Sequence, residues 1–227
     1  MKTRFLDGPL AMTTRFLMLN PEEPREDRLR QATAVLEAGE ILSLPTETFY
    51  GLSVDAFDVE ACGKVNDIKG KPRGSPMLLL LSGAEQIGMV ACNLPASFAS
   101  MAEMFWPGPL SLVVPAGPDV PAGVTGGLGT VGVRVPGLAL PRMLAAALGR
   151  PITGVSANRM GRPPCRTAAE VAQVFPAGVA MILDGGPSTG GAPSTVLDLA
   201  GPYPRILREG AIPISALRPF LSDLRKN

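Results

Sequence analysis

Short apolar runs alternate with helical patterns along most of the chain. Apolar residues recur at helical spacing between residues 27 and 38, and Gly39 ends that pattern. The continuous apolar run at 77–81 is bounded by turn residues, which predicts a strand covered on both faces. Further strands are predicted at 41–44, 110–114, 131–135, 152–155, 181–183, 195–199 and 205–207, and further helices at 58–68, 84–91, 96–105, 138–148, 167–175 and 213–223.

The order of these elements predicts an α/β fold with a twisted, mixed parallel and antiparallel sheet flanked by helices. Helices and strands alternate early and strands cluster late, which does not suit a strictly doubly wound sheet. Residues 1–25 are expected to form an irregular N-terminal lead-in, and residues 26–227 a single domain. Gly and Pro are frequent at 115–129 and Gly at 185–191, so both segments are expected to be loops.

Composition excludes several kinds of chemistry. Hydrophobic residues make up 46% of the 227 and charged residues 18%, so most of the chain should pack into a core. The net charge of +1 argues against a surface coated for nucleic-acid binding. The absence of histidine removes Ser-His-Asp and Cys-His catalysis and most zinc sites. Three widely separated cysteines form no CxxC pair and fit a reducing cytosol.

No targeting or membrane segment is expected. Arg4, Asp7 and Arg15 interrupt the first 18 residues, which argues against a signal peptide. No stretch approaches 18 uncharged apolar residues, so no transmembrane helix is predicted, and a cytoplasmic location is expected.

A basic, glycine-containing loop is the first candidate for binding chemistry. Lys69, Lys71 and Arg73 fall within five residues, directly before the apolar run at 77–81. Such a loop can hold phosphates, although it lacks the Gly-x4-Gly-Lys-Ser/Thr pattern; the alternative is a solvated basic turn. The G-x-G-x-x-G pattern at 127–132 precedes a strand instead of joining a strand to a helix, so it is not interpreted as a dinucleotide fingerprint.

Polar residues where the apolar strands end are the second candidate. Ligands of open α/β sheets gather at strand ends, which predicts an anion or nucleotide site there. Arg134 lies inside a predicted strand and needs an acidic partner or an anionic ligand. Taken singly, each of these residues can equally cap a helix, form a turn or pair with a surface carboxylate. The other candidates are Thr46, Glu47, Thr48, Ser156, Asn158, Ser194 and Arg208.

The segments together resemble the YrdC-like family of threonylcarbamoyl-AMP synthases. They occur in family order across residues 40–210. The matching stretches are Leu44-Pro45-Thr46-Glu47-Thr48-Phe49-Tyr50-Gly51-Leu52, Lys69-Gly70-Lys71-Pro72, Ser75-Pro76, Phe105-Trp106-Pro107-Gly108-Pro109-Leu110, Val133-Arg134-Val135-Pro136, Ser156-Ala157-Asn158, Ser194-Thr195-Val196 and Ile206-Leu207-Arg208-Glu209-Gly210.

This resemblance implies a YrdC-like domain with a positively charged concave face and a nucleotidyltransferase reaction. Threonine, bicarbonate or CO2 and ATP would give threonylcarbamoyl-AMP and pyrophosphate, assisted by Mg2+. The product would pass to a threonylcarbamoyl transferase complex for tRNA modification, and weak RNA binding would be compatible with the concave face. Because only residues 211–227 follow Gly210, the additional C-terminal domain of longer members is expected to be absent.

The resemblance also assigns roles by position. Thr48, Arg134 and Ser194 would bind threonine, with the Arg134 guanidinium on its carboxylate. Lys69 and Lys71 would be catalytic cations, and no protein nucleophile is needed. Lys71 stands where the family usually has Arg, and Leu80 where some members have His. Residues matching nucleotide-binding positions are Lys71, Ser75, Thr130, Ser156, Asn158 and Arg208.

A second hypothesis is a non-catalytic protein of the same fold that holds nucleotide or RNA, because a fold does not fix a function. The cations, Ser156 and Asn158 favour catalysis, and the nearly neutral net charge disfavours a dedicated RNA binder. Threonine-dependent turnover of ATP would distinguish the two.

Overall fold

The computed structural model describes residues 14–221 and 225–226, whose strands form two sheets. The smaller sheet contains, in spatial order, β1 (Arg15–Met18), β9 (Met181–Asp184), β2 (Leu42–Leu44), β3 (Gly51–Ser53) and β8 (Val155–Ser156). The larger sheet contains β12 (Arg225–Lys226), β11 (Arg205–Arg208), β10 (Thr195–Asp198), β5 (Leu110–Pro115), β6 (Thr130–Arg134), β4 (Leu78–Leu80) and β7 (Ile152–Thr153).

Both sheets mix parallel and antiparallel neighbours. In the smaller sheet β2 runs parallel to β9 and antiparallel to β3. In the larger sheet β5 runs parallel to β10 and antiparallel to β6. The predicted mixed α/β fold is therefore confirmed, with its strands divided between two sheets.

One strand run crosses from the larger sheet to the smaller one. β7 pairs with β4, and β8, after the single residue Gly154, pairs with β3. A Cβ atom on Gly154 would lie 2.5 Å from Cγ of Leu80, so the chain passes closely over β4 at this crossing. The crossing carries Ser156 to the space between the two sheets.

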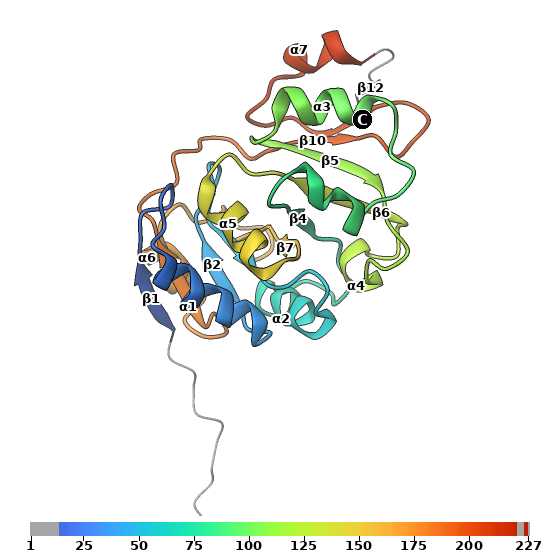
Figure 1. Ribbon diagram of the computed structural model, residues 1–227. Helices are drawn as coiled ribbons and strands as arrows, with labels where there is room; N and C mark the ends of the chain where they lie inside the picture. Colours follow the sequence, from blue (N-terminus) through green and yellow to red (C-terminus); the bar gives the residue numbers. More distant parts are fainter. Residues whose placement is uncertain (1–13, 222–224, 227) are drawn as a thin grey trace, which may run out of the picture.

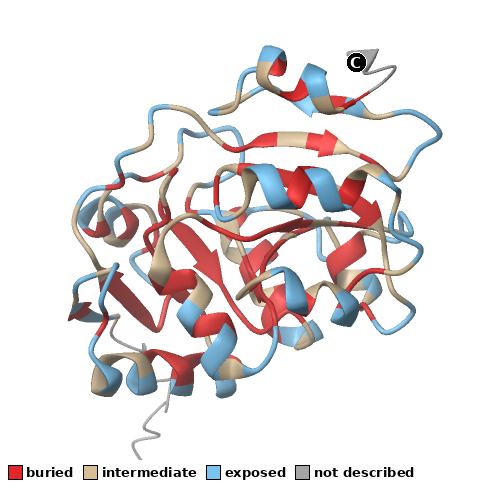
Figure 2. Ribbon diagram, turned by 45° about the horizontal axis from the view of Figure 1, so that its top comes forward, coloured by how far each residue is buried: buried red, intermediate tan, exposed pale blue. Residues whose placement is uncertain are grey.

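Helices flank the sheets and complete two hydrophobic clusters. The helices are α1 (Glu26–Glu37), α2 (Val59–Lys69), α3 (Ser97–Phe105), α4 (Ala122–Thr125), α5 (Ala139–Leu148), α6 (Ala168–Val174) and α7 (Ile214–Leu217), with 3-10 turns η1 (Ala84–Met89) and η2 (Arg218–Phe220). Helices α1 and α5 pack together beside β2, β9 and β4, while α3 and α7 lie at the opposite end of the molecule (Figure 1). Most strands are buried beneath these helices (Figure 2).

Local signals set the ends of α2, which leads into the basic loop. The Asp58 carboxylate accepts a hydrogen bond from the backbone N–H of Ala61 at 2.9 Å and caps the first turn, as the sequence predicts. Gly70 ends the helix in the left-handed region, with φ of +70°, which favours glycine.

The structure corrects the expected elements in several places, including the helix expected at 84–91, which is the 3-10 turn η1. The expected irregular lead-in contains β1, whose pattern is weak because Leu17 alone is buried while Phe16 and Met18 are exposed. The expected loop at 115–129 contains the single turn α4, and β3 was not predicted because it is only three residues long. The expected helix at 213–223 changes to a 3-10 turn after Leu217, at Arg218-Pro219; residues 222 and 223 lie outside the described residues.

Within the described residues, no helix is both long and apolar enough to cross a membrane.

Candidate active site

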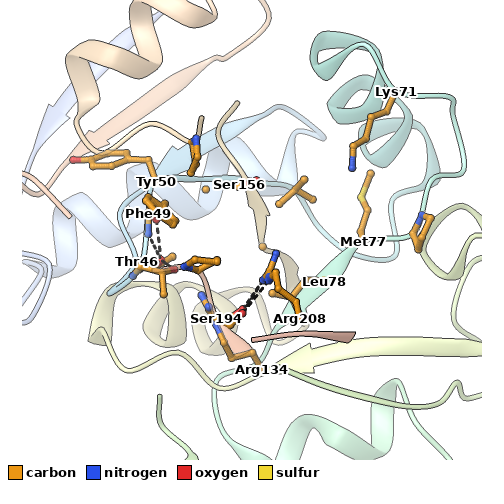
Figure 3. A pocket seen from close by; sticks show the side chains of 17 residues that line it. Thr46, Phe49, Tyr50, Lys71, Met77, Leu78, Arg134, Ser156, Ser194 and Arg208 are labelled. Carbon is orange, nitrogen blue, oxygen red and sulfur yellow. Dashed lines mark hydrogen bonds between the residues drawn. The ribbon is translucent and has the colours of Figure 1, made fainter. Parts of the chain in front are cut away.

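A cavity of about 480 Å³ lies between the two sheets, within the size range of small-molecule sites. Its walls come from the turn before β3, from β4, from the end of β6, and from the segments around β8, β10 and β11. Figure 3 shows Arg134, Ser194 and Arg208 gathered at one end and Lys71 with Met77 at another. The lining includes the candidate Thr46 and six of the residues to which the family resemblance assigns roles: Thr48, Lys71, Arg134, Ser156, Ser194 and Arg208.

A hydroxyl-bonded turn forms one wall of the cavity. Thr46 Oγ1 accepts hydrogen bonds from the backbone N–H groups of Thr48 at 3.2 Å and Phe49 at 3.3 Å. The hydroxyls of Thr46 and Thr48 lie 2.9 Å apart, and Thr46 also donates to the Phe49 carbonyl. Thr46 therefore orients the Thr48 hydroxyl in the cavity. The turn that the sequence allows for Thr46 is thus observed, since a threonine hydroxyl two residues before a backbone donor is a known turn signal.

Arg134 is the central cation of the site. Its side chain is 4% exposed, and its Nε atom lies 3.9 Å from Oε1 of Glu47. Within the described part of the chain, neither Nε nor the two Glu47 oxygens has a hydrogen-bond partner. Burial lowers the pKa of Arg134, Arg208 lowers it further and Glu47 opposes the shift. The expected acidic partner is present, and Arg134 is one of the residues that line the cavity.

Arg208 and Ser194 form a hydrogen-bonded pair beside Arg134. Nε and Nη2 of Arg208 donate to the Ser194 carbonyl at 3.1 and 2.9 Å, and Nη2 also reaches Ser194 Oγ at 3.1 Å. Ser194 Oγ lies 2.9 Å from the hydroxyl of Ser111. Burial lowers the pKa of Arg208. Two positive charges thus lie at the Ser194 end, which favours a negatively charged ligand group.

Lys69 lies beneath the cavity wall instead of facing the cavity. Its ammonium donates to the carbonyls of Ser156 and Asn158 and to Asn158 Oδ1 at 3.1 Å. Asn158 Oδ1 also accepts from Ser156 Oγ at 2.6 Å. All three ammonium protons are used by this turn. Lys69 therefore supports Ser156 in this structure, and its catalytic role stays a prediction. Asn158, expected at the nucleotide, is also a member of this turn and does not line the cavity.

The cations of the basic loop differ in position: Arg73 is held in ion pairs on the protein surface, whereas Lys71 lines the cavity. Arg73 forms ion pairs with Glu60 at 3.0 Å and Asp67 at 2.6 Å, so it fastens the loop to α2. Lys71 lines the cavity and makes no side-chain hydrogen bond to the described residues. Ser75 donates to the Pro72 carbonyl at 2.7 Å, and neither it nor Thr130 lines the cavity, so their nucleotide contacts stay predictions.

The protein offers Mg2+ few ligands of its own here. The cavity lining contains no carboxylate, and the described residues contain no group of three His, Cys, Asp or Glu side chains that could hold a metal. Since Mg2+ prefers oxygen ligands and is often bound through substrate phosphates, it would have to enter with a phosphorylated ligand.

Burial lowers the pKa of Lys69 to about 8, with Lys71 adding to the shift and Cys165 opposing it. In the unfolded chain this lysine keeps its proton up to its ordinary value of 10.5. Between about pH 8 and pH 10.5 the unfolded state binds more protons than the folded state. The free energy of unfolding should therefore rise with pH over this range. We expect the stability of the wild type relative to Lys69→Met to increase from pH 7 to pH 10 in urea denaturation. A stability difference that is constant over this range would contradict the shift.

Together the features define an α/β protein with a cationic, hydroxyl-lined cleft between two sheets, suited to an anionic ligand. The chain belongs to the Sua5/YciO/YrdC family, whose profile, described as "Telomere recombination", matches residues 34–210. The family resemblance found from the sequence is confirmed.

Relatives support this membership over most of the chain. The chain is 35% identical over 210 residues to the threonylcarbamoyl-AMP synthase of Pyrococcus abyssi, covering 92% of this chain and 62% of that protein. It is also 35% identical over 201 residues to a putative threonylcarbamoyl-AMP synthase of Mycobacterium tuberculosis, covering 88% and 92%. The crystal structure of P. abyssi Sua5 complexed with L-threonine superposes with a TM-score of 0.90 at 34% identity, covering 94% of this chain and 63% of that one. The chain thus spans less than two thirds of the P. abyssi protein.

Proposed function

We propose that this chain is an L-threonylcarbamoyladenylate synthase, a nucleotidyltransferase that uses L-threonine, bicarbonate or CO2, and ATP. The observation that carries the proposal is Arg134, a buried arginine that lines the cavity and whose Nε atom has no hydrogen-bond partner within the described residues. A second cation, Lys71, lies apart from it in the same cavity (Figure 3). This arrangement suits a ligand set whose carboxylate meets Arg134 and whose phosphates extend from Arg208 toward Lys71.

The proposed binding roles follow from side-chain chemistry. Arg134 binds the threonine carboxylate through its planar guanidinium, and the hydroxyls of Thr48 and Ser194 bind the rest of the amino acid. Lys71 and Arg208 offset the negative charge of the phosphates. Ser156, held by the Lys69-supported turn, provides a hydroxyl for the nucleotide. The Ser75 and Thr130 contacts are part of the same proposal.

The reaction needs positioning and charge more than a protein nucleophile. The threonine amine gives up a proton and forms a carbamate with CO2. A carbamate oxygen then attacks the α-phosphorus of ATP, and the bond to the β-phosphate oxygen breaks to release pyrophosphate. Mg2+ would supply additional charge neutralisation on the phosphates. A trapped covalent acyl- or phospho-enzyme would contradict this scheme.

We also propose a destination for the reaction product. The product would pass to a threonylcarbamoyl transferase complex for tRNA modification in the cytoplasm. Weak RNA binding on a basic concave face remains part of this proposal.

Incubation with ATP, threonine and bicarbonate tests the function directly. Pyrophosphate and threonylcarbamoyl-AMP should form together, and both should vanish when threonine or bicarbonate is omitted. Serine in place of threonine serves as the control for substrate choice. ATP binding without such turnover would refute the synthase and favour the alternative of a non-catalytic binding protein.

A further inference from the structure

Glu47 is a buried carboxylate with an unusual lack of hydrogen bonds. Within the described part of the protein, both of its oxygens are shielded from solvent and neither has a hydrogen-bond partner. Its nearest cation is Arg134, at 3.9 Å between Oε1 and Nε. A buried charge without hydrogen bonds is destabilising unless an opposite charge compensates it. Glu47 therefore interacts with Arg134 mainly through charge.

The residues around Glu47 place its side chain next to the cavity wall and not in its lining. A Cβ atom on Gly137 would lie 3.6 Å from both Cγ and Cδ of Glu47, so the backbone of Gly137 lies beside this side chain. Thr46 and Thr48 line the cavity on either side of Glu47 in the sequence, but Glu47 does not. Glu47 thus lies on the Nε side of Arg134, outside the cavity lining.

We propose that Glu47 is a positioning residue that holds Arg134 from its Nε side and leaves the two terminal nitrogens for a ligand carboxylate. The charge balance supports this arrangement. Glu47, Arg134 and Arg208 together carry one positive charge, and a bound carboxylate brings the group to zero. Without Glu47, the buried Arg134 would have the cation Arg208 nearby and no fixed anion beside it. The inference rests on the proposed function in naming threonine as the source of the carboxylate.

Glu47→Gln tests the inference because it removes the charge and keeps the side-chain shape. Calorimetry with the full chain should show threonine affinity weakened by about tenfold or more, and ATP affinity within about twofold of the wild type. Glu47→Asp keeps the negative charge but moves it away from Arg134 by one methylene. Its threonine affinity should therefore lie between those of the wild type and Glu47→Gln. Glu40→Gln is the matched control, because Glu40 pairs with Lys64 at 3.2 Å and lies outside the cavity lining.

A second signal separates this inference from the proposed function. The Nε–H resonance of Arg134, assigned by its loss in Arg134→Lys, should shift in Glu47→Gln without any ligand. Unchanged threonine affinity, or an equal loss of threonine and ATP affinity with reduced thermal stability, would overturn the positioning role. A wild-type chain that binds no threonine would refute the proposed function instead, and the ligand-free resonance would still decide whether Glu47 holds Arg134.

Discussion

Replacing Arg134 by alanine is expected to weaken threonine binding by about 10²- to 10³-fold while ATP affinity changes by about threefold or less. The buried guanidinium is the group proposed to bind the threonine carboxylate, and its removal also leaves the Glu47 carboxylate buried without its cation. Calorimetric titration with each ligand separately measures the two affinities.

Arg134→Lys is the control for charge alone, because lysine keeps the positive charge and loses the planar fork. It should recover only part of the threonine affinity. Thermal unfolding of each variant separates lost binding from lost structure. An ATP affinity that falls more than the threonine affinity would refute the role assigned to Arg134.

Gly190→Ala is expected to reduce threonine-dependent turnover by about 10- to 100-fold, since displacements of about 1 Å near a site can have such effects. A Cβ atom on Gly190 would lie 2.4 Å from the Thr48 carbonyl oxygen, 2.7 Å from Thr48 Cα and 2.8 Å from the Glu47 carbonyl oxygen. These are backbone atoms, so the turn that carries Thr48 must move. Steady-state rates at varied threonine concentration should show the loss mainly in the threonine KM.

Gly191→Ala is the matched control because a Cβ atom there meets nothing within 4 Å. Its turnover should stay within about twofold of the wild type. Equal effects of the two substitutions would mean that the 185–191 loop does not set the position of Thr48.

The fold was predictable where apolar patterns are long and bounded by clear signals. The 77–81 run and the Asp58-capped helix are local features, and both are confirmed as β4 and α2. β1 was missed because its stability depends on pairing with β9, more than 150 residues later in the chain, and not on its own pattern. The division into two sheets also depends on pairing between strands that are far apart in the sequence. The apolar pattern of a strand does not indicate which other strand it pairs with.

The candidate site was predictable at the level of residue type and family position. Six of the residues to which the family resemblance assigns roles, including Arg134 and Lys71, do line one cavity. The sequence did not predict that Lys69 points under the Ser156–Asn158 turn, because motif position identifies a residue without giving the direction of its side chain. The same limit applies to Arg73, whose charge looked equivalent to that of Lys71 and is instead paired with Glu60 and Asp67.

The strand run that crosses at Gly154 has a consequence for how the two sheets unfold. β7 and β8 belong to different sheets but are joined by one residue, so neither sheet can lose its edge strand without pulling on the other. The two sheets are therefore expected to melt in one cooperative transition, and the cleft should lose its shape only when the whole domain does. A bound ligand that touches both walls would then raise the thermal midpoint of the entire domain.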